Sequence, residues 1–192
     1  MPTFMFTRLA ISTLVLLANA VLGLTLAAEP KPVLSGTVTR VVDGDTIIVQ
    51  LQTGPIRVRL YGIDAPESTQ AEGREATAYL VKRIAHQSVE LEPYSQDRYN
   101  RMVAIIYLGD EDIDETMVQQ GFAWAYRQYL KRSDTDYCYY EMDARKAHLG
   151  LWFLPAAQQI APWEYRHLKS GGPYTDYSSE TAEHCIAELG KR

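Results

Sequence analysis

Three short segments of the sequence combine acidic side chains with arginines. They are residues 41–46 (VVDGDT), residues 59–67 (RLYGIDAPE) and residues 97–101 (DRYNR). Each segment alone is weak evidence for a functional site. A DGD sequence, for example, is usually only a hairpin turn. Together they supply carboxylate oxygens, which are the ligands of hard divalent cations, and guanidinium groups, which bind phosphate oxygens through paired hydrogen bonds.

In this order and spacing, the three segments closely resemble the staphylococcal nuclease family, over residues 33–152. The resemblance implies a calcium-dependent phosphodiesterase that hydrolyses DNA and RNA with little sequence preference, preferably single-stranded, and leaves 3′-phosphates. It also implies site roles by position: Asp45, Asp64 and the main-chain carbonyl of Ala65 as calcium ligands, and Arg59, Glu67 and Arg101 as catalytic residues.

The chemistry of phosphodiester hydrolysis agrees with these roles. The substrate is an anion, and its transition state places more negative charge on the nonbridging oxygens, where positive charge is needed. Arg59 could hold two phosphate oxygens, and Arg101 could act nearer the leaving oxygen. Glu67 is the carboxylate of the group without a metal role, so it is the candidate to orient or deprotonate the attacking water.

Some positions depart from the family or are ambiguous. Ala65 replaces a threonine of the family's reference enzyme, but a main-chain ligand survives that change. Asn100 replaces a glycine, and asparagine tolerates left-handed backbone conformations. Four residues are candidate substrate contacts, although the tyrosines among them could equally serve packing in a chain with thirteen: Arg98, Tyr99, Tyr126 and Tyr129.

Two other functions compete with the nuclease. One is a catalytically silent OB module that binds single-stranded nucleic acid by stacking and backbone charge. The other is an extracytoplasmic interaction domain that uses calcium only for stability. The retained carboxylates and arginines favour the enzyme.

The elements that would position these residues follow from periodicity. Alternating or β-rich runs predict strands, and Gly73 precedes apolar residues at three- and four-residue spacing, which predict an amphipathic helix. The fold class is therefore α+β, a five-stranded OB-type Greek-key barrel with about three helices. Expected strands are 33–42, 46–51, 56–63, 89–91 and 102–108, and two further helices are expected at 113–120 and 134–148, the latter with Asp134 as N-cap.

The composition supports one globular domain. The 192 residues are 46% hydrophobic and 22% charged, and the net charge of −5 argues against a protein that coats polyanions nonspecifically. Residues 29–154 form the expected nuclease domain, and residues 155–192 form an extension that prolines and glycines interrupt, with little regular structure. We expect a monomer.

The first 28 residues resemble a secretory signal peptide. Arg8 precedes an uncharged, leucine-rich run, and small-residue cleavage sites follow Ala20 and Ala28. The alternative is an uncleaved membrane anchor, because the run is long enough to cross a bilayer. Cleavage predicts an exported protein, periplasmic or secreted, without stable membrane association.

The chain has two cysteines, Cys138 and Cys185, both in the part expected to be exported. An oxidising compartment favours a disulfide between them, which would tie the extension to the domain. A metal site is the weaker alternative, because two isolated cysteines lack CxxC spacing.

Overall fold

The computed structural model describes residues 33–191. The predicted signal peptide, its cleavage sites and the alternative membrane anchor lie outside these residues. Within residues 33–191, no helix has the length and apolar character needed to cross a membrane.

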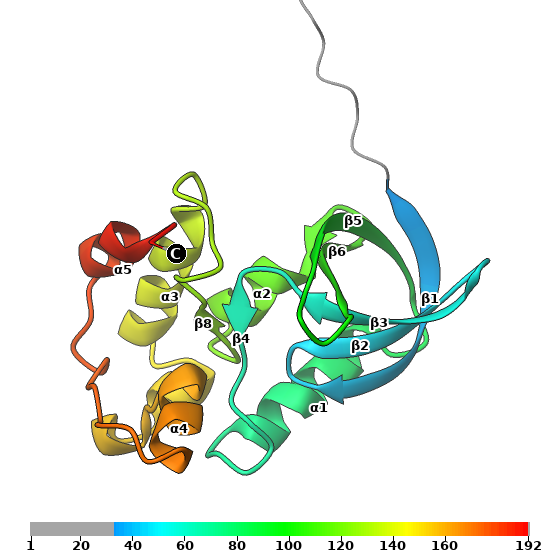
Figure 1. Cartoon of the computed structure of the whole chain (residues 1–192). Helices are drawn as coiled ribbons and strands as arrows, with labels where there is room; N and C mark the ends of the chain where they lie inside the picture. Colours follow the sequence, from blue (N-terminus) through cyan, green and yellow to red (C-terminus); the bar gives the residue numbers. More distant parts are fainter. Residues whose placement is uncertain (1–32, 192) are drawn as a thin grey trace, which may run out of the picture. The chain divides into compact units, whose positions relative to one another are not determined.

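Five strands close into a barrel (Figure 1). The sheet order is β3-β2-β1-β5-β6, with antiparallel neighbours, and a parallel pairing between β3 and β6 closes the ring. This confirms the predicted OB-type barrel. The strands are β1 (Leu34–Asp43), β2 (Thr46–Leu51), β3 (Gly54–Leu60), β5 (Ser88–Gln96) and β6 (Met102–Leu108).

Alternation along β3 turns its arginines away from the core. Val58 and Leu60 are buried, whereas Arg57 is exposed and Arg59 is partly exposed. Thr46, the first residue of β2, pairs with Arg59. The β1–β2 turn therefore lies beside Arg59.

Helices and two small strand pairings accompany the barrel, and α3, α4 and α5 lie together on one side of it (Figure 1). The structure has five α-helices in residues 33–191, more than the three predicted, because the extension is also helical. They are α1 (Gly73–Ile84), α2 (Ile113–Gln119), α3 (Asp136–Lys146), α4 (Pro162–Lys169) and α5 (Ala182–Glu188). The small pairings join β4 (Ile63–Asp64) to β8 (Trp124–Ala125), and β7 (Glu111–Asp112) to β6, and two 3-10 turns lie at η1 (Gly150–Phe153) and η2 (Ala156–Gln158).

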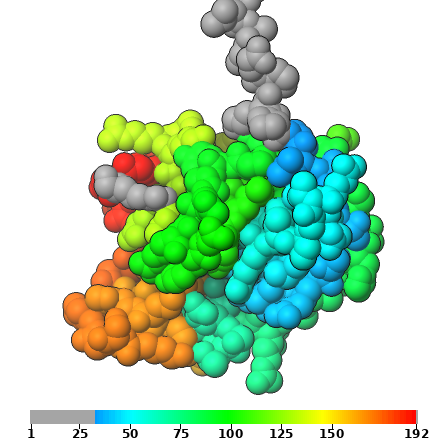
Figure 2. Space-filling view, turned by 45° about the vertical axis from the view of Figure 1, so that its right-hand side comes forward, coloured from blue at the N-terminus to red at the C-terminus, as the bar shows by residue number. Residues whose placement is uncertain are grey.

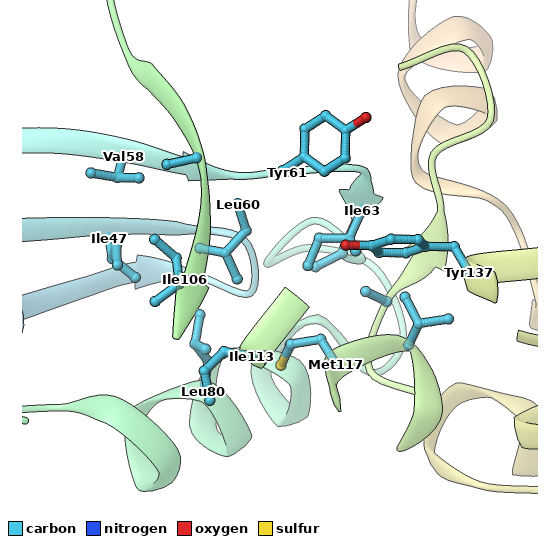
Figure 3. Close-up of a cluster of buried hydrophobic side chains, with 14 of the residues drawn as sticks. Ile47, Val58, Leu60, Tyr61, Ile63, Leu80, Ile106, Ile113, Met117 and Tyr137 are labelled. Atoms are coloured by element: carbon cyan, nitrogen blue, oxygen red, sulfur yellow. The ribbon is translucent and has the colours of Figure 1, made fainter. Parts of the chain in front are cut away.

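The main core lies between the barrel strands and the helices α1 and α2 (Figure 3). Leu80 of α1 lies below Ile106 and Ile47 of the barrel, and Met117 of α2 continues this core toward Tyr137. All five are nearly inaccessible to solvent, so the core spans barrel and helices. This packing supports the barrel strands that lead into the acidic and arginine segments at residues 41–46 and 59–67.

Residues 155–191 contain more regular structure than expected. They contain α4 and α5, and Trp163 packs against a second core that includes Trp124 and Trp152. Prolines and glycines do interrupt the segment, but Pro162 stands at the first turn of α4, where its missing N–H costs nothing. The prediction of little regular structure was wrong, because tertiary packing stabilises helices too short to be evident from periodicity.

A disulfide joins Cys138 of α3 to Cys185 of α5, which confirms the predicted bond and excludes the alternative metal site. The two cysteines are 47 positions apart, and in the chain-entropy model a disulfide that closes a loop of this length stabilises the fold by about 4 kcal/mol. A buried ion pair lies in the same region: Arg127 contacts Glu141 at 3.0 Å and Glu180 of the extension at 2.6 Å. The extension is therefore attached to the domain by covalent, apolar and ionic contacts.

Asp134 does not cap α3 as predicted, because Thr135 is the N-cap residue. The Asp134 carboxylate instead accepts hydrogen bonds from the Lys131 main-chain N–H at 2.8 Å and from the Tyr61 hydroxyl at 2.5 Å. It joins the loop before α3 to the end of β3.

Candidate active site

A cleft of about 780 Å³ opens at the end of the barrel. It brings together all ten residues predicted for metal, catalytic and substrate roles, although they come from separate parts of the chain. Those lining residues are Asp45, Arg59, Asp64, Ala65, Glu67, Arg98, Tyr99, Arg101, Tyr126 and Tyr129. The structure thus supports a common location for them, while their individual roles remain predictions.

The β1–β2 turn places Asp45 against the loop after β4. One Asp45 carboxylate oxygen accepts the Ala65 main-chain N–H at 2.9 Å, and the other accepts the Thr46 hydroxyl at 3.1 Å. Gly44 permits this approach, because a Cβ there would lie 2.6 Å from the Ala65 Cβ. A side chain at position 44 would push the two loops apart.

Arg59 bridges the two predicted metal ligands. Its Nη1 lies 3.0 Å from an Asp45 oxygen, and its Nη2 lies 2.9 Å from an Asp64 oxygen. The Arg59 side chain is only 12% exposed. Burial alone would lower the pKa of Arg59, but the charges of Asp45 and Asp64 outweigh burial and raise it, so Arg59 is a fixed positive charge between two carboxylates.

Burial disfavours the charged form of two carboxyl groups at the site, Asp64 and Asp43. Burial raises the pKa of Asp64 to about 6, against the opposing effect of Arg59 and Arg166. Burial and the neighbouring Asp45 raise the pKa of Asp43 to about 6. Additional positive charge near these groups would therefore be favourable.

The loop of residues 97–101 positions Arg101. Asp97 accepts the Arg101 main-chain N–H at 2.9 Å and its Nε at 2.7 Å. Asn100 has a φ of 63°, the left-handed conformation that asparagine was expected to tolerate. Arg101 Nη1 donates to the Thr46 hydroxyl at 3.3 Å, which links it to Asp45.

Glu67 lies at the edge of the cleft on a tight loop before α1. Its main-chain N–H donates to the Gln70 side chain at 2.9 Å, and its carbonyl accepts the Gln70 N–H at 2.7 Å. Gly73 is packed against this loop, because a Cβ there would lie 2.0 Å from the Glu67 carbonyl oxygen. The Glu67 side chain is 43% exposed, so water can reach it.

The candidate substrate contacts divide into two groups. Tyr99 is exposed on the 97–101 loop, where Arg98 Nη2 donates to its hydroxyl at 2.7 Å. On the other side, Tyr126 and Tyr129 have ring centroids 4.4 Å apart. Tyr126 also stacks on Trp163 at 5.4 Å, so it has a packing role as well as a surface in the cleft.

Sequence reasoning missed Arg166. This residue of α4 donates from Nη2 to Asp64 at 2.8 Å and from Nη1 to Glu67 at 2.9 Å. Figure 2 shows the extension (orange) against the teal segment that carries Glu67. The available signal was the sequence PWEYR at residues 162–166, but nothing local connects it to a carboxylate a hundred residues earlier.

The donor atoms suit a calcium ion. Asp45 and Asp64 lie within 3.0 Å of the Arg59 guanidinium, and the Ala65 main-chain N–H donates to Asp45, so the two carboxylates and the Ala65 main chain share one region. Calcium accepts such irregular oxygen sets together with water. Among residues 33–191, no three His, Cys, Asp or Glu side chains form a metal-binding group, so protein side chains alone would not complete the coordination.

Comparison with known proteins agrees with the geometry. The family model described as "Staphylococcal nuclease homologue" matches residues 57–153. That range includes Arg59, Asp64, Glu67 and Arg101; Asp45 and Arg166 lie outside it.

Individual proteins are similar over longer stretches. The chain is 43% identical over 140 residues to "Micrococcal nuclease" of Shigella flexneri, which covers 68% of this chain and 79% of that protein. It is 36% identical over 159 residues to "Protein ParB" of Escherichia coli, covering 78% and 89% respectively. It is 38% identical over 116 residues to "Staphylococcal-like nuclease CAN1" of Arabidopsis thaliana, covering 60% of this chain and 35% of that protein. With the barrel and the cleft in place, these similarities show that the chain belongs to the staphylococcal nuclease family.

Proposed function

We propose that this protein is a calcium-dependent nuclease that hydrolyses phosphodiester bonds of DNA and RNA with little sequence preference. The observation that carries the proposal is the cleft in which Arg59 joins Asp45 to Asp64, with Glu67 and Arg101 on its walls. Family membership supports a nuclease. The residue roles rest on the chemistry of the site.

The arginines would bind and orient the phosphate. Arg59 is held by Asp45 and Asp64, so it costs little reorganisation as charge develops on the nonbridging oxygens. Arg101 lies on the other side of Asp45, joined to it through Thr46, and would contact the phosphate nearer the leaving oxygen. A lysine would supply charge at either position but not two directed hydrogen bonds.

Glu67 would act on the water. Its exposed carboxylate lies near Asp64 through their shared partner Arg166, and it would accept the proton of the attacking water as the new P–O bond forms. The bond from phosphorus to the 5′-oxygen would then break, the leaving oxygen would take up a proton from solvent to become a 5′-hydroxyl, and the phosphate would remain on the 3′-oxygen of the other product. A calcium ion held by Asp45, Asp64 and the Ala65 carbonyl would add positive charge at the phosphate.

The cleft favours unpaired substrate. A phosphate must reach Arg59 and Asp64, whose side chains are 12% and 1% exposed, which a breathing or single-stranded chain does more readily than a stiff duplex. Tyr99, Tyr126 and Tyr129 offer aromatic faces at the cleft on which bases could stack. We propose that the protein acts as a monomer.

Hydrolysis of a labelled single-stranded oligonucleotide, with and without calcium, tests the proposal. We expect cleavage in calcium, loss of cleavage on chelation, and poor replacement by magnesium, which demands octahedral geometry. Asp45→Ala should raise the calcium requirement, and excess calcium should partly restore activity. Binding without cleavage would instead identify a silent OB module, and calcium-dependent stability without binding would identify an interaction domain.

We also propose that the protein is exported, to the periplasm or the medium. The disulfide between Cys138 and Cys185 supports this, because such bonds persist in oxidising compartments. Mass spectrometry of the protein from its native source should find a mature N-terminus after Ala20 or Ala28. Soluble cytoplasmic protein that retains Met1 would contradict export, and intact Met1 on membrane-bound protein would identify the anchor.

A further inference from the structure

Arg166 occupies the part of the site where a cation and a phosphate are expected. Its guanidinium contacts both oxygens of Asp64, at 3.3 Å and 2.8 Å, and one oxygen of Glu67 at 2.9 Å. It also lies 3.5 Å from the Tyr126 hydroxyl. One side chain of the extension therefore touches a predicted metal ligand, the predicted base and an aromatic candidate.

Contacts of α4 with the rest of the domain determine the position of Arg166. Helix α4 is fastened to the loop that carries Glu67, since the Tyr165 and Thr69 hydroxyls lie 2.9 Å apart and Gln70 donates to the Ile160 carbonyl at 3.1 Å. Trp163 of α4 also stacks on Tyr126, with an interplanar angle of 4°. These contacts fix the backbone of α4 beside the cleft.

Arg166 and a divalent cation would compete for Asp64. Arg59 already holds one Asp64 oxygen, and Arg166 contacts both, so a calcium ion bound there would lie next to a guanidinium of like charge. Arg59 is 12% exposed and contacts two carboxylates, whereas Arg166 is 42% exposed at the edge of the cleft. Arg166 is the group that can move.

We propose that Arg166 takes the place of calcium on the Asp64 carboxylate, and that it moves to a substrate phosphate when calcium binds. This inference rests on the proposed function and adds a third phosphate-binding arginine, from outside the matched range of residues 57–153. An arginine suits both tasks, because its planar fork pairs with carboxylate and phosphate alike. Since α4 stays fixed, only the flexible side chain has to move.

The proposal predicts opposite effects of one substitution on two ligands. In Arg166→Gln, calcium measured by titration calorimetry without nucleic acid should bind at least about fivefold more tightly, because a like charge has been removed. A phosphorothioate single-stranded DNA oligonucleotide, measured by fluorescence anisotropy in saturating calcium, should bind about tenfold more weakly. The plot of the logarithm of the oligonucleotide binding constant against the logarithm of the salt concentration should become less steep by about 0.7. This is the contribution of one single-strand phosphate contact.

Matched variants separate this role from charge and folding. Lys169→Gln removes one positive charge from the same helix, where Lys169 contacts the Thr69 hydroxyl, and should change calcium affinity less than twofold. Arg166→Lys keeps the charge without the fork, so its calcium affinity should stay near wild type while oligonucleotide binding weakens. Thermal melting should show that all three variants are folded.

Unchanged or weaker calcium binding in Arg166→Gln would overturn the competition, and unchanged oligonucleotide affinity and salt slope would overturn the phosphate contact. Neither measurement requires hydrolysis. A wild-type protein that binds both ligands but cleaves nothing would therefore refute the proposed nuclease, while the role of Arg166 would still be decided.

Discussion

Glu67→Gln is expected to lower turnover by at least about 10², with little change in substrate binding. Glutamine keeps the shape of the side chain and can still accept the hydrogen bond from Arg166 at the position of the Glu67 oxygen. It cannot accept a proton from water at neutral pH. The loss should therefore appear in kcat rather than KM, measured with a fluorogenic single-stranded oligonucleotide in saturating calcium.

Glu75→Gln is the matched control, because Glu75 is exposed in the first turn of α1 and does not line the cleft. It makes the same chemical change and should leave turnover near that of the unmodified protein. If Glu67→Gln retained turnover as well, Glu67 would not be the base. If chelation of calcium also made no difference, the silent binding module would become the better explanation.

Arg59→Lys should reduce both turnover and stability. A single ammonium group cannot span Asp45 and Asp64 as the Arg59 fork does, at 3.0 and 2.9 Å, so one largely buried carboxylate loses its partner. We expect the free energy of unfolding to fall by about 1–3 kcal/mol. Turnover should fall by about 10² to 10³, as when a preorganised transition-state donor is removed.

Arg57→Lys makes the identical change two residues earlier on β3, where the side chain is exposed. Arg57→Lys should change neither turnover nor the free energy of unfolding appreciably. Urea denaturation without calcium measures the free energy of unfolding, and kcat in saturating calcium measures turnover. Wild-type values of both for Arg59→Lys would show that the bridge between the carboxylates is dispensable.

Local patterns in the sequence were sufficient to predict the strands of the barrel. The alternating pattern predicted a strand at residues 56–63, and β3 in the structure buries Val58 and Leu60 while exposing Arg57. The strand pattern also located the arginine and carboxylate segments at strand ends, where side chains from different strands meet. These inferences succeed because strand periodicity is a property of neighbouring residues.

Helix ends and the extension were less predictable. Asp134 has the right residue type for an N-cap, but its carboxylate binds Tyr61, which is 73 positions earlier. The short helices α4 and α5 depend on Trp163, on the Cys138–Cys185 disulfide and on contacts with α3. Short helices are marginal without such packing, so periodicity within them carries little information.

The sequence alone therefore determined the residue types and their order: carboxylates for a hard cation, arginines for phosphate and a pair of cysteines. Only the tertiary structure decided that Arg59 lies between Asp45 and Asp64, and that Arg166 reaches Asp64 across 102 positions of the chain. The physical reason is that such contacts depend on how the extension packs on the barrel. That packing is set by the buried ion pair of Arg127, by aromatic stacking and by the disulfide, none of which is a local property of residues 162–166.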